Sequence, residues 1–194
     1  MTTARIVTLD IETSPILAFV WSLWKQNVGL NQIHTDWSIL SFCAKVLGEK
    51  AVQYEDTGGR GIGKVRDDSA LMKKLWKVLD DADIIIAQNG VSFDIKKINA
   101  RLIDLGMPPP SPYKVVDTML EARKIAKFTS NRLAWLSDVL TDIPKSDHKK
   151  FPGFTLWTEC LADNPAAWAE MRKYNVIDVK ATELVYLKLR PYVI

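Results

Sequence analysis

The sequence predicts a mixed α/β domain, in which a sheet with an antiparallel meander and additional parallel strands is flanked by helices. Three strand-like runs come first, strand and helix patterns then alternate, and helical patterns fill the C-terminal part. Strands joined by short turns pair antiparallel, whereas strands joined through helices become parallel neighbours. The 194 residues, 47% of them hydrophobic, fit a single domain over residues 1–194 with room for a core.

The meander is predicted from runs rich in apolar and β-branched residues. Ala4–Glu12 is the first such run, and Trp37–Leu47 is the second. Ala51–Asp56 pairs with the second run across a short turn that contains Gly48. The following loop, Thr57–Gly63, is rich in glycine, but it lacks the Lys-Ser/Thr end of a phosphate-binding P-loop.

The alternating part begins with a helix over Ser69–Asp81, because Leu71, Leu75 and Leu79 share one face behind a Ser cap. The apolar run Asp83–Asn89 is typical of a buried parallel strand. The remaining expected elements are a helix over Phe93–Gly106, a strand over Tyr113–Thr118, helices at 118–127 and 131–141, and helix in one or two pieces over Pro165–Leu189.

Composition excludes several classes of protein. The N-terminal "MTTARIV" lacks the features of a signal peptide, and no apolar run is long enough to span a bilayer, so we expect a cytoplasmic protein with no membrane partner. A net charge of +3 permits a nucleic-acid partner without requiring one. Cys43 and Cys160 are too few for a disulfide framework and lack metal-like spacing, so we expect reduced, buried thiols.

The first candidate site residues are Asp10 and Glu12, at the end of the first predicted strand. Residues i and i+2 of a strand point to the same face, so the two carboxylates project side by side. Without a partner they would repel each other and lose hydration. Hard cations such as Mg²⁺ or Mn²⁺ prefer carboxylate oxygen and remove both problems. The alternative is a strand end with two solvated acids.

Two further motifs carry acids. Asp94 follows a buried strand and falls in the first turn of the next predicted helix, where the helix dipole alone also favours an acid. Tyr174 and Asp178 are four residues apart and share a face of the last helix. Tyr113 and Asp117 have the same spacing, but on a strand they lie about 13 Å apart, too far for one site. The ordinary alternative for Tyr174 is a half-buried tyrosine beside an unrelated acid.

Taken in order, these motifs resemble the DnaQ-like (DEDD) 3′–5′ exonuclease superfamily, which has a ribonuclease-H-like fold. They span most of the chain, from Asp10 to Asp178. With Tyr174 at this position of the third motif, the sequence resembles the tyrosine subgroup, which includes polymerase proofreading domains. The resemblance implies an enzyme that hydrolyses phosphodiester bonds with two divalent cations, Mg²⁺ or Mn²⁺. It implies that Asp10 bridges both ions, that Glu12 and Asp178 complete one site, that Asp94 serves the other, and that Tyr174 positions the attacking water.

The expected substrate is single-stranded nucleic acid, with DNA favoured over RNA by the resemblance to proofreading domains. Thr13, Asn89 and Phe93 would meet it by family analogy. Lys145 and Lys149 lie in a segment where basic and aromatic residues interleave, which is typical either of a strand-binding surface or of a solvated loop.

The sequence leaves open the role of two tryptophans and the exact activity. Trp21 and Trp24 either line the substrate groove or, as large aromatics usually do, pack in the core or a hairpin. An exoribonuclease of the same superfamily and a catalytically silent nucleic-acid-binding module are the rival functions. Because the sequence contains no polymerase domain, the resemblance implies an exonuclease that acts alone or with a polymerase or repair protein in trans.

Overall fold

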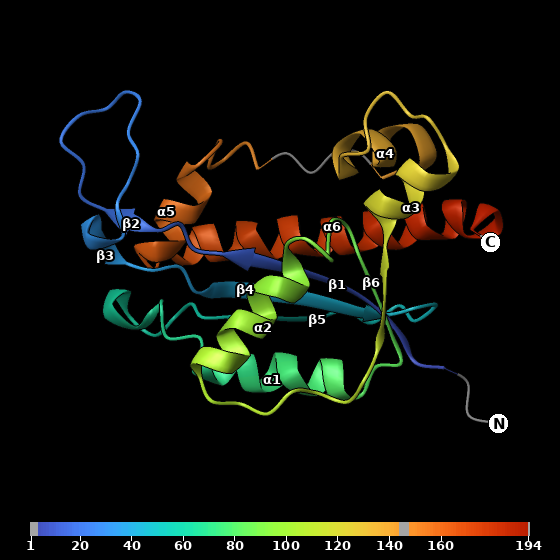
Figure 1. Ribbon diagram of the computed structural model, residues 1–194, viewed down its shortest axis with the longest axis horizontal. Helices are drawn as coiled ribbons and strands as arrows, with labels where there is room; N and C mark the ends of the chain where they lie inside the picture. Colours follow the sequence, from blue (N-terminus) through green and yellow to red (C-terminus); the bar gives the residue numbers. More distant parts are fainter. Residues whose placement is uncertain (1–3, 144–147, 194) are drawn as a thin grey trace.

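The structure is a computed structural model that describes residues 4–143 and 148–193. Five strands form the main sheet in the order β5-β4-β1-β6-β7 (Figure 1). β1 (Ile6–Thr13), β4 (Ile39–Val46) and β5 (Gln53–Asp56) form the expected antiparallel meander. β6 (Ile84–Ala87) and β7 (Lys114–Asp117) continue the sheet in parallel with β1. The predicted mixed sheet is confirmed.

The alternation of side chains along β1 decides which residues reach the core and which reach the other face. Val7, Leu9 and Ile11 are buried in the largest apolar cluster. That cluster is completed by α1 (Ser69–Asp80) and α2 (Asp94–Asp104), which cover one face of the sheet (Figure 1). The even-numbered residues of β1 therefore point to the opposite face.

The opposite face is covered by α6 (Pro165–Leu189), a single helix of 25 residues. α6 packs on β1 and β4, and three shorter helices pack against it. These are α3 (Thr118–Ile125), α4 (Leu133–Leu140) and α5 (Thr155–Leu161). Two smaller apolar clusters fill this side, one between α5, α6 and β4 and one between α3, α4 and α6.

Some local expectations need correction. The N-cap of α1 is Asp68, which makes no side-chain cap, and the expected Ser69 is the first helical residue. The sequence did not predict α5 or the small hairpin of β2 (Leu17–Ala18) and β3 (Ile33–Thr35). Single 3-10 turns at Leu30–Gln32, Ile62–Lys64 and Arg190–Tyr192 were also not predicted. Such short elements have too few residues for a periodic pattern.

Cys43 and Cys160 are both buried and free, as expected. Within residues 4–143 and 148–193, no helix combines the length and apolar character needed to cross a membrane.

Candidate active site

Two acids enter the site from β1. Asp10 and Glu12 lie on the face of the sheet that α6 covers, opposite Cys43 and Ser41 of β4. Both side chains are half-buried. The predicted projection from one face of a strand is therefore confirmed.

Asp94 reaches the same place from the other face of the sheet edge. Pairing between β1 and β6 extends as far as Thr8 and Ile86, so β1 continues beyond its neighbour. The backbone N–H of Ile11 donates to Asp94 Oδ1 at 3.1 Å. Asp94 is the first residue of α2 and is only 3% exposed. This hydrogen bond fixes the start of α2 against the strand that carries Asp10 and Glu12.

Asp117 holds the backbone of the turn that precedes Asp94. Asp117, at the end of β7, accepts hydrogen bonds from the N–H groups of Asn89 (3.0 Å) and Val91 (3.1 Å). It also caps α3 by accepting from the first N–H groups of that helix. Asn89 has a φ of +61°, a conformation that asparagine tolerates better than most residues. Asp117 is thus a backbone anchor, whereas Tyr113, just before β7, packs against the large apolar cluster.

The third contribution comes from α6. Tyr174 and Asp178 lie one turn apart, and the Tyr174 hydroxyl donates to the Asp178 carboxylate. His148 and Trp157 pack edge-on against the Tyr174 ring, with centroid distances of 5.3 and 6.1 Å. Two aromatic rings therefore flank the phenol and limit its movement.

Neighbouring carboxylates raise the pKa of both acids on β1. Burial raises the pKa of Asp10 well above its usual value, and the charges of Asp94, Glu12 and Asp178 raise it further. For Glu12, burial and then Asp178 raise the pKa to about 8. These shifts require that Asp94 and Asp178 lie near the two acids of β1, in surroundings of low polarity.

The pKa values of Asp94 and Asp178 are also raised. Burial raises the pKa of Asp94 to about 7, against the opposing hydrogen bond from Ile11. Burial raises the pKa of Asp178 to about 6, although Tyr174 and His148 both act to lower it. The pKa of Tyr174 is raised by burial and by the Asp178 charge. Its phenol therefore stays protonated and is suited to orient a water molecule.

Two residues that were not predicted from the sequence hold the acids in place. Asn175 is fully buried, donates to the Asp10 carboxylate, and accepts from Ser41 Oγ at 3.1 Å. The indole N–H of Trp157 donates to Glu12 Oε2 at 3.1 Å. An asparagine in the apolar run "YNVIDV" was a usable signal, because a buried amide needs partners. Trp157 had no comparable signal.

The chemistry of these donors fits a hard divalent cation, although a cation would have to rearrange them. In the parts of the chain that the structure describes, no group of three or more His, Cys, Asp or Glu side chains could hold a metal ion as it stands. Each acid is instead turned towards a protein donor: Asn175, Trp157, the Ile11 N–H or the Tyr174 hydroxyl. The charges acting on Asp10 are all carboxylates. Carboxylate oxygens are the ligands that Mg²⁺ and Mn²⁺ prefer.

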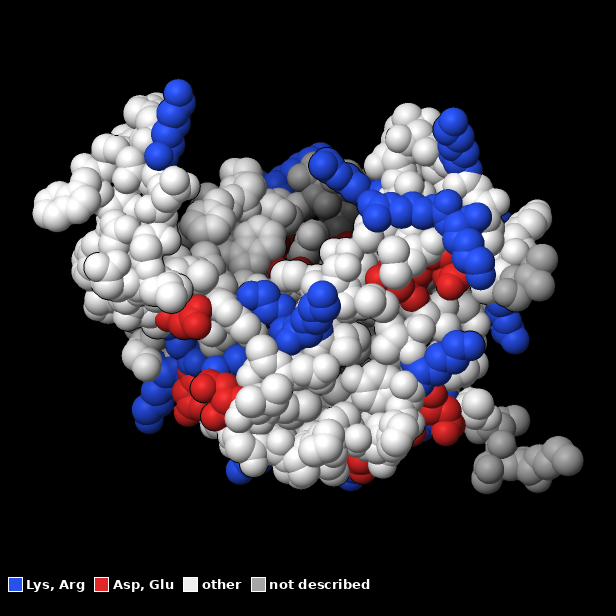
Figure 2. Space-filling model, in the orientation of Figure 1, with Lys and Arg blue, Asp and Glu red and all other residues white. Residues whose placement is uncertain are grey.

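The surface of the molecule is hollowed beside the lobe of β2–β3. Figure 2 shows a hollow between the lobe of β2–β3 and the lobe of α3–α4, with acidic atoms visible in its depth. Thr13 lines a cavity of about 260 Å³ together with Ser14, Pro15, Phe154 and Trp157. Because Trp157 also binds Glu12, this cavity lies directly beside the acids. A role of Thr13 in meeting the substrate stays a prediction.

The other residues predicted to bind substrate lie in two further segments of the chain. Asn89 and Phe93 lie on the turn before Asp94, where Phe93 N–H donates to Asn89 O at 3.0 Å and the Phe93 ring is partly exposed. Lys149 is exposed and follows His148 in the chain. Lys145 lies outside the described residues.

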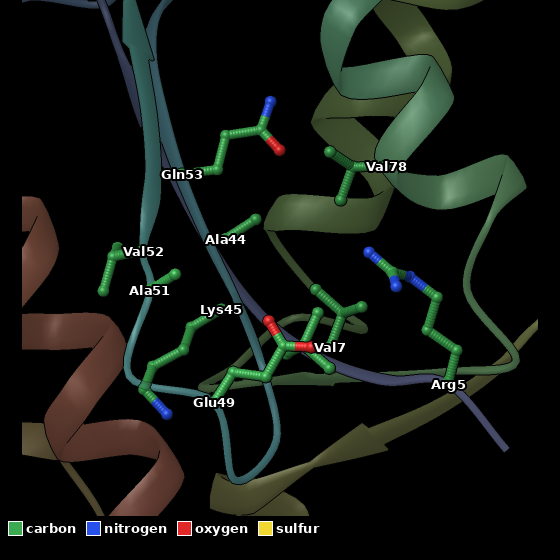
Figure 3. Close-up of a pocket in the computed structure, with 10 residues that line it drawn as sticks. Arg5, Val7, Ala44, Lys45, Glu49, Ala51, Val52, Gln53 and Val78 are labelled. Carbon is green, nitrogen blue, oxygen red and sulfur yellow. The ribbon is translucent and has the colours of Figure 1, made fainter. Parts of the chain in front are cut away.

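A second cavity, of about 220 Å³, lies at the other end of the sheet (Figure 3). Arg5 and Val7 line it at the start of β1, and Glu49 lines it from the β4–β5 turn. Val7 and Glu12 are five residues apart on one strand, which corresponds to about 16 Å. This cavity is therefore separate from the acids and offers them no substrate path.

Comparisons with known proteins agree with the fold. The family model of the RNase_H superfamily matches residues 47–190, which excludes the strand that bears Asp10 and Glu12. A DNA polymerase III of the PolC type from Ureaplasma parvum serovar 3 (strain ATCC 700970) is 39% identical over 90 residues, covering 45% of this chain and 6% of that protein. The family B DNA polymerase of the hyperthermophilic archaeon Pyrobaculum calidifontis matches with a TM-score of 0.69 and 16% identity, over 98% of this chain and 25% of that one. The chain thus spans only a small part of both polymerases, and the second likeness shows the fold alone.

Proposed function

Because this chain belongs to the RNase_H superfamily, we propose that it is a metal-dependent 3′–5′ exonuclease that releases mononucleotides from single-stranded DNA. The observation that carries the proposal is the convergence of Asp10, Glu12, Asp94 and Asp178 beside Tyr174, where the other three acids all raise the pKa of Asp10. A stable fold gains nothing from four neighbouring acids, since their repulsion destabilises it. Clustered carboxylates with perturbed pKa values are typical of sites that perform chemistry.

The four acids would hold two divalent cations, Mg²⁺ or Mn²⁺. When bound, such ions activate a water molecule and stabilise the leaving oxygen of a phosphodiester. Asp10 is central among the acids, because the other three all act on its pKa. Asn175 would keep Asp10 oriented, and Trp157 would do the same for Glu12.

Tyr174 would position the attacking water. Its raised pKa keeps the hydroxyl protonated, and its hydrogen bond to Asp178 aims it at the acids. The rings of His148 and Trp157 hold the phenol in that direction. Orientation of a reactant in this way lowers the entropic part of the barrier.

The cavity beside Thr13 would receive the 3′-terminal nucleotide. Its aromatic walls, Phe154 and Trp157, offer surfaces on which a base can stack. The PolC-type relative is a DNA polymerase by its name, which supports DNA over RNA. It also supports a role beside a polymerase, with residues 1–194 as the exonuclease unit.

The test is degradation of a 5′-labelled single strand in Mg²⁺ or Mn²⁺. We expect a ladder that shortens from the 3′ end, no cleavage in chelator, and no cleavage of a circular strand. An RNA strand of the same sequence tests whether the chain is instead an exoribonuclease. Asp10→Asn should abolish activity while the fold is retained. Wild-type rates for folded Asp10→Asn protein would overturn the site, and rapid cleavage of the circle would overturn the polarity.

A further inference from the structure

The hairpin between β1 and β4 carries large aromatic side chains that nothing in the described structure covers. Its tip, residues 20–29, extends away from the sheet beyond β2 and β3 (Figure 1). Trp21 is 98% exposed and Trp24 is 82% exposed. The expectation that these tryptophans pack in the core or the hairpin is therefore wrong. Tryptophan faces of this size dominate binding energetics when a partner covers them.

The base of the hairpin is fixed to the site. Arg66 donates to Pro15 O at 3.1 Å and to Ser14 Oγ at 3.0 Å, immediately after Thr13. Phe19 N–H donates to Gln32 O at 2.9 Å and closes the two strands below the tip. The tip therefore stands at a defined position relative to the strand that bears the acids.

Hydrogen bonds within the tip also hold its conformation. The Gln26 side chain donates to Trp24 O at 2.8 Å and to Ser22 Oγ. Lys25, between Trp24 and Gln26, has a φ of +52°, and the backbone bends there. The tryptophans are thus presented on a bend that the Gln26 side chain braces. A preorganised surface loses less conformational entropy when it binds.

The charge of the hairpin selects the kind of partner. Residues 13–35 contain no Asp or Glu, although the whole chain has 23 acids in 194 residues, and their one Lys or Arg is Lys25. In Figure 2 the corresponding lobe is white with a blue side chain at its end, and it stands beside the hollow in which acidic atoms are visible. A surface of aromatic faces with a cation and no carboxylate matches a polyanion whose units are flat rings.

We propose that Trp21 and Trp24 form a base-stacking platform that binds the single strand on the 5′ side of the nucleotide held at the acids. The inference rests on the proposed function, because it assumes that a strand end enters the hollow. It adds a binding site outside the hydrolytic centre. The platform would act on strand affinity and leave the chemical step unchanged.

The experiment measures the Kd of a labelled strand of about twelve thymidines by fluorescence anisotropy in Ca²⁺, for wild type and for the double variant Trp21→Ala/Trp24→Ala. Stacking of two bases predicts a Kd raised at least about ten-fold. Leu23→Ala, which removes an exposed apolar side chain from the same tip but no ring, should change the Kd less than about two-fold. Tyr192→Ala, an exposed aromatic at the C-terminal end, is the matched control outside the hairpin.

A small substrate separates this inference from the proposed function. The p-nitrophenyl ester of thymidine 5′-phosphate has one base and cannot reach both the acids and the tip. Wild type and double variant should hydrolyse it equally, whereas the double variant should degrade dilute strands more slowly. Equal strand Kd values in the two proteins would overturn the platform while the exonuclease stands. An equally large effect of Leu23→Ala would also overturn it, because strand binding would then depend on apolar contact in general and not on stacking rings. If wild type hydrolyses neither ester nor strand, the proposed function fails and the platform with it.

Discussion

Removing one charge from the acid cluster should stabilise the cation-free protein, and Asp94→Asn tests this most cleanly. Asp94 is 3% exposed, and its pKa is raised from 3.8 to about 7. The folded state therefore binds this proton more tightly than the unfolded state does. The associated stability is fully present below about pH 4 and is lost as the pH rises towards 7.

The size of the effect follows from the shift. About three pKa units at 1.36 kcal/mol each set an upper value of about 4 kcal/mol above pH 7. Because the neighbouring acids titrate together and share the protons, we expect about 2 kcal/mol at pH 8. Asn keeps an oxygen that can accept from the Ile11 N–H, so the packing of α2 is retained. For a chain of this length, the midpoint of thermal unfolding should rise by about 4–8 °C.

The assay is thermal unfolding followed by circular dichroism in chelator, at pH 4 and pH 8. Asp138→Asn removes an exposed carboxylate on α4 and serves as the control, with little change at either pH. The reasoning is refuted if Asp94→Asn is no more stable than wild type at pH 8. It is also refuted if the gain is equally large at pH 4, where the acid is already protonated.

Further predictions concern the other groups of the site. Tyr174→Phe should slow single-turnover cleavage about 10²- to 10⁴-fold and leave strand binding in Ca²⁺ unchanged, whereas Tyr113→Phe should cleave normally; the reverse order would show that the motif is misplaced. Asn175→Ala should lower the free energy of unfolding in urea by about 1–3 kcal/mol, because buried groups lose their partner; an unchanged midpoint would contradict this. Trp157→Phe keeps a ring but removes the N–H that orients Glu12, so half-maximal activity should require more Mg²⁺. Mg²⁺ should raise the unfolding midpoint more at pH 8 than at pH 5, because protons compete with the cation at acids whose pKa values lie at about 6 to about 8.

The part of the site that could be predicted is the part set by local geometry. Strand alternation alone places Asp10 and Glu12 on one face, and helix spacing alone places Tyr174 beside Asp178. Their meeting with Asp94 depends on where β6 stops and α2 begins, which no local pattern fixes. The sequence predicted that these acids meet only through the order of all three motifs along the chain, which resembles a known family.

The supporting contacts could not be predicted for a different reason. Trp157 reaches Glu12 across 145 positions of sequence, from a short helix with no clear periodicity. Trp21 and Trp24 violate the usual burial of large aromatics because no other described element covers the hairpin tip. Composition states how apolar a segment is, but only the packing of distant elements decides whether it is covered.

The way in which the hairpin is closed has a consequence for how such a nuclease could change over evolution. The hydrogen bond between Phe19 and Gln32 joins the two strands of the hairpin below the tip, and the hydrogen bond from Arg66 to Pro15 lies closer to β1. The residues of the tip can therefore be shortened, lengthened or exchanged without disturbing β1 and its acids. Long surface insertions are inexpensive once their ends are held together. Related proteins could therefore differ in the tip, and so in the substrates they bind, while they keep the same acids on β1.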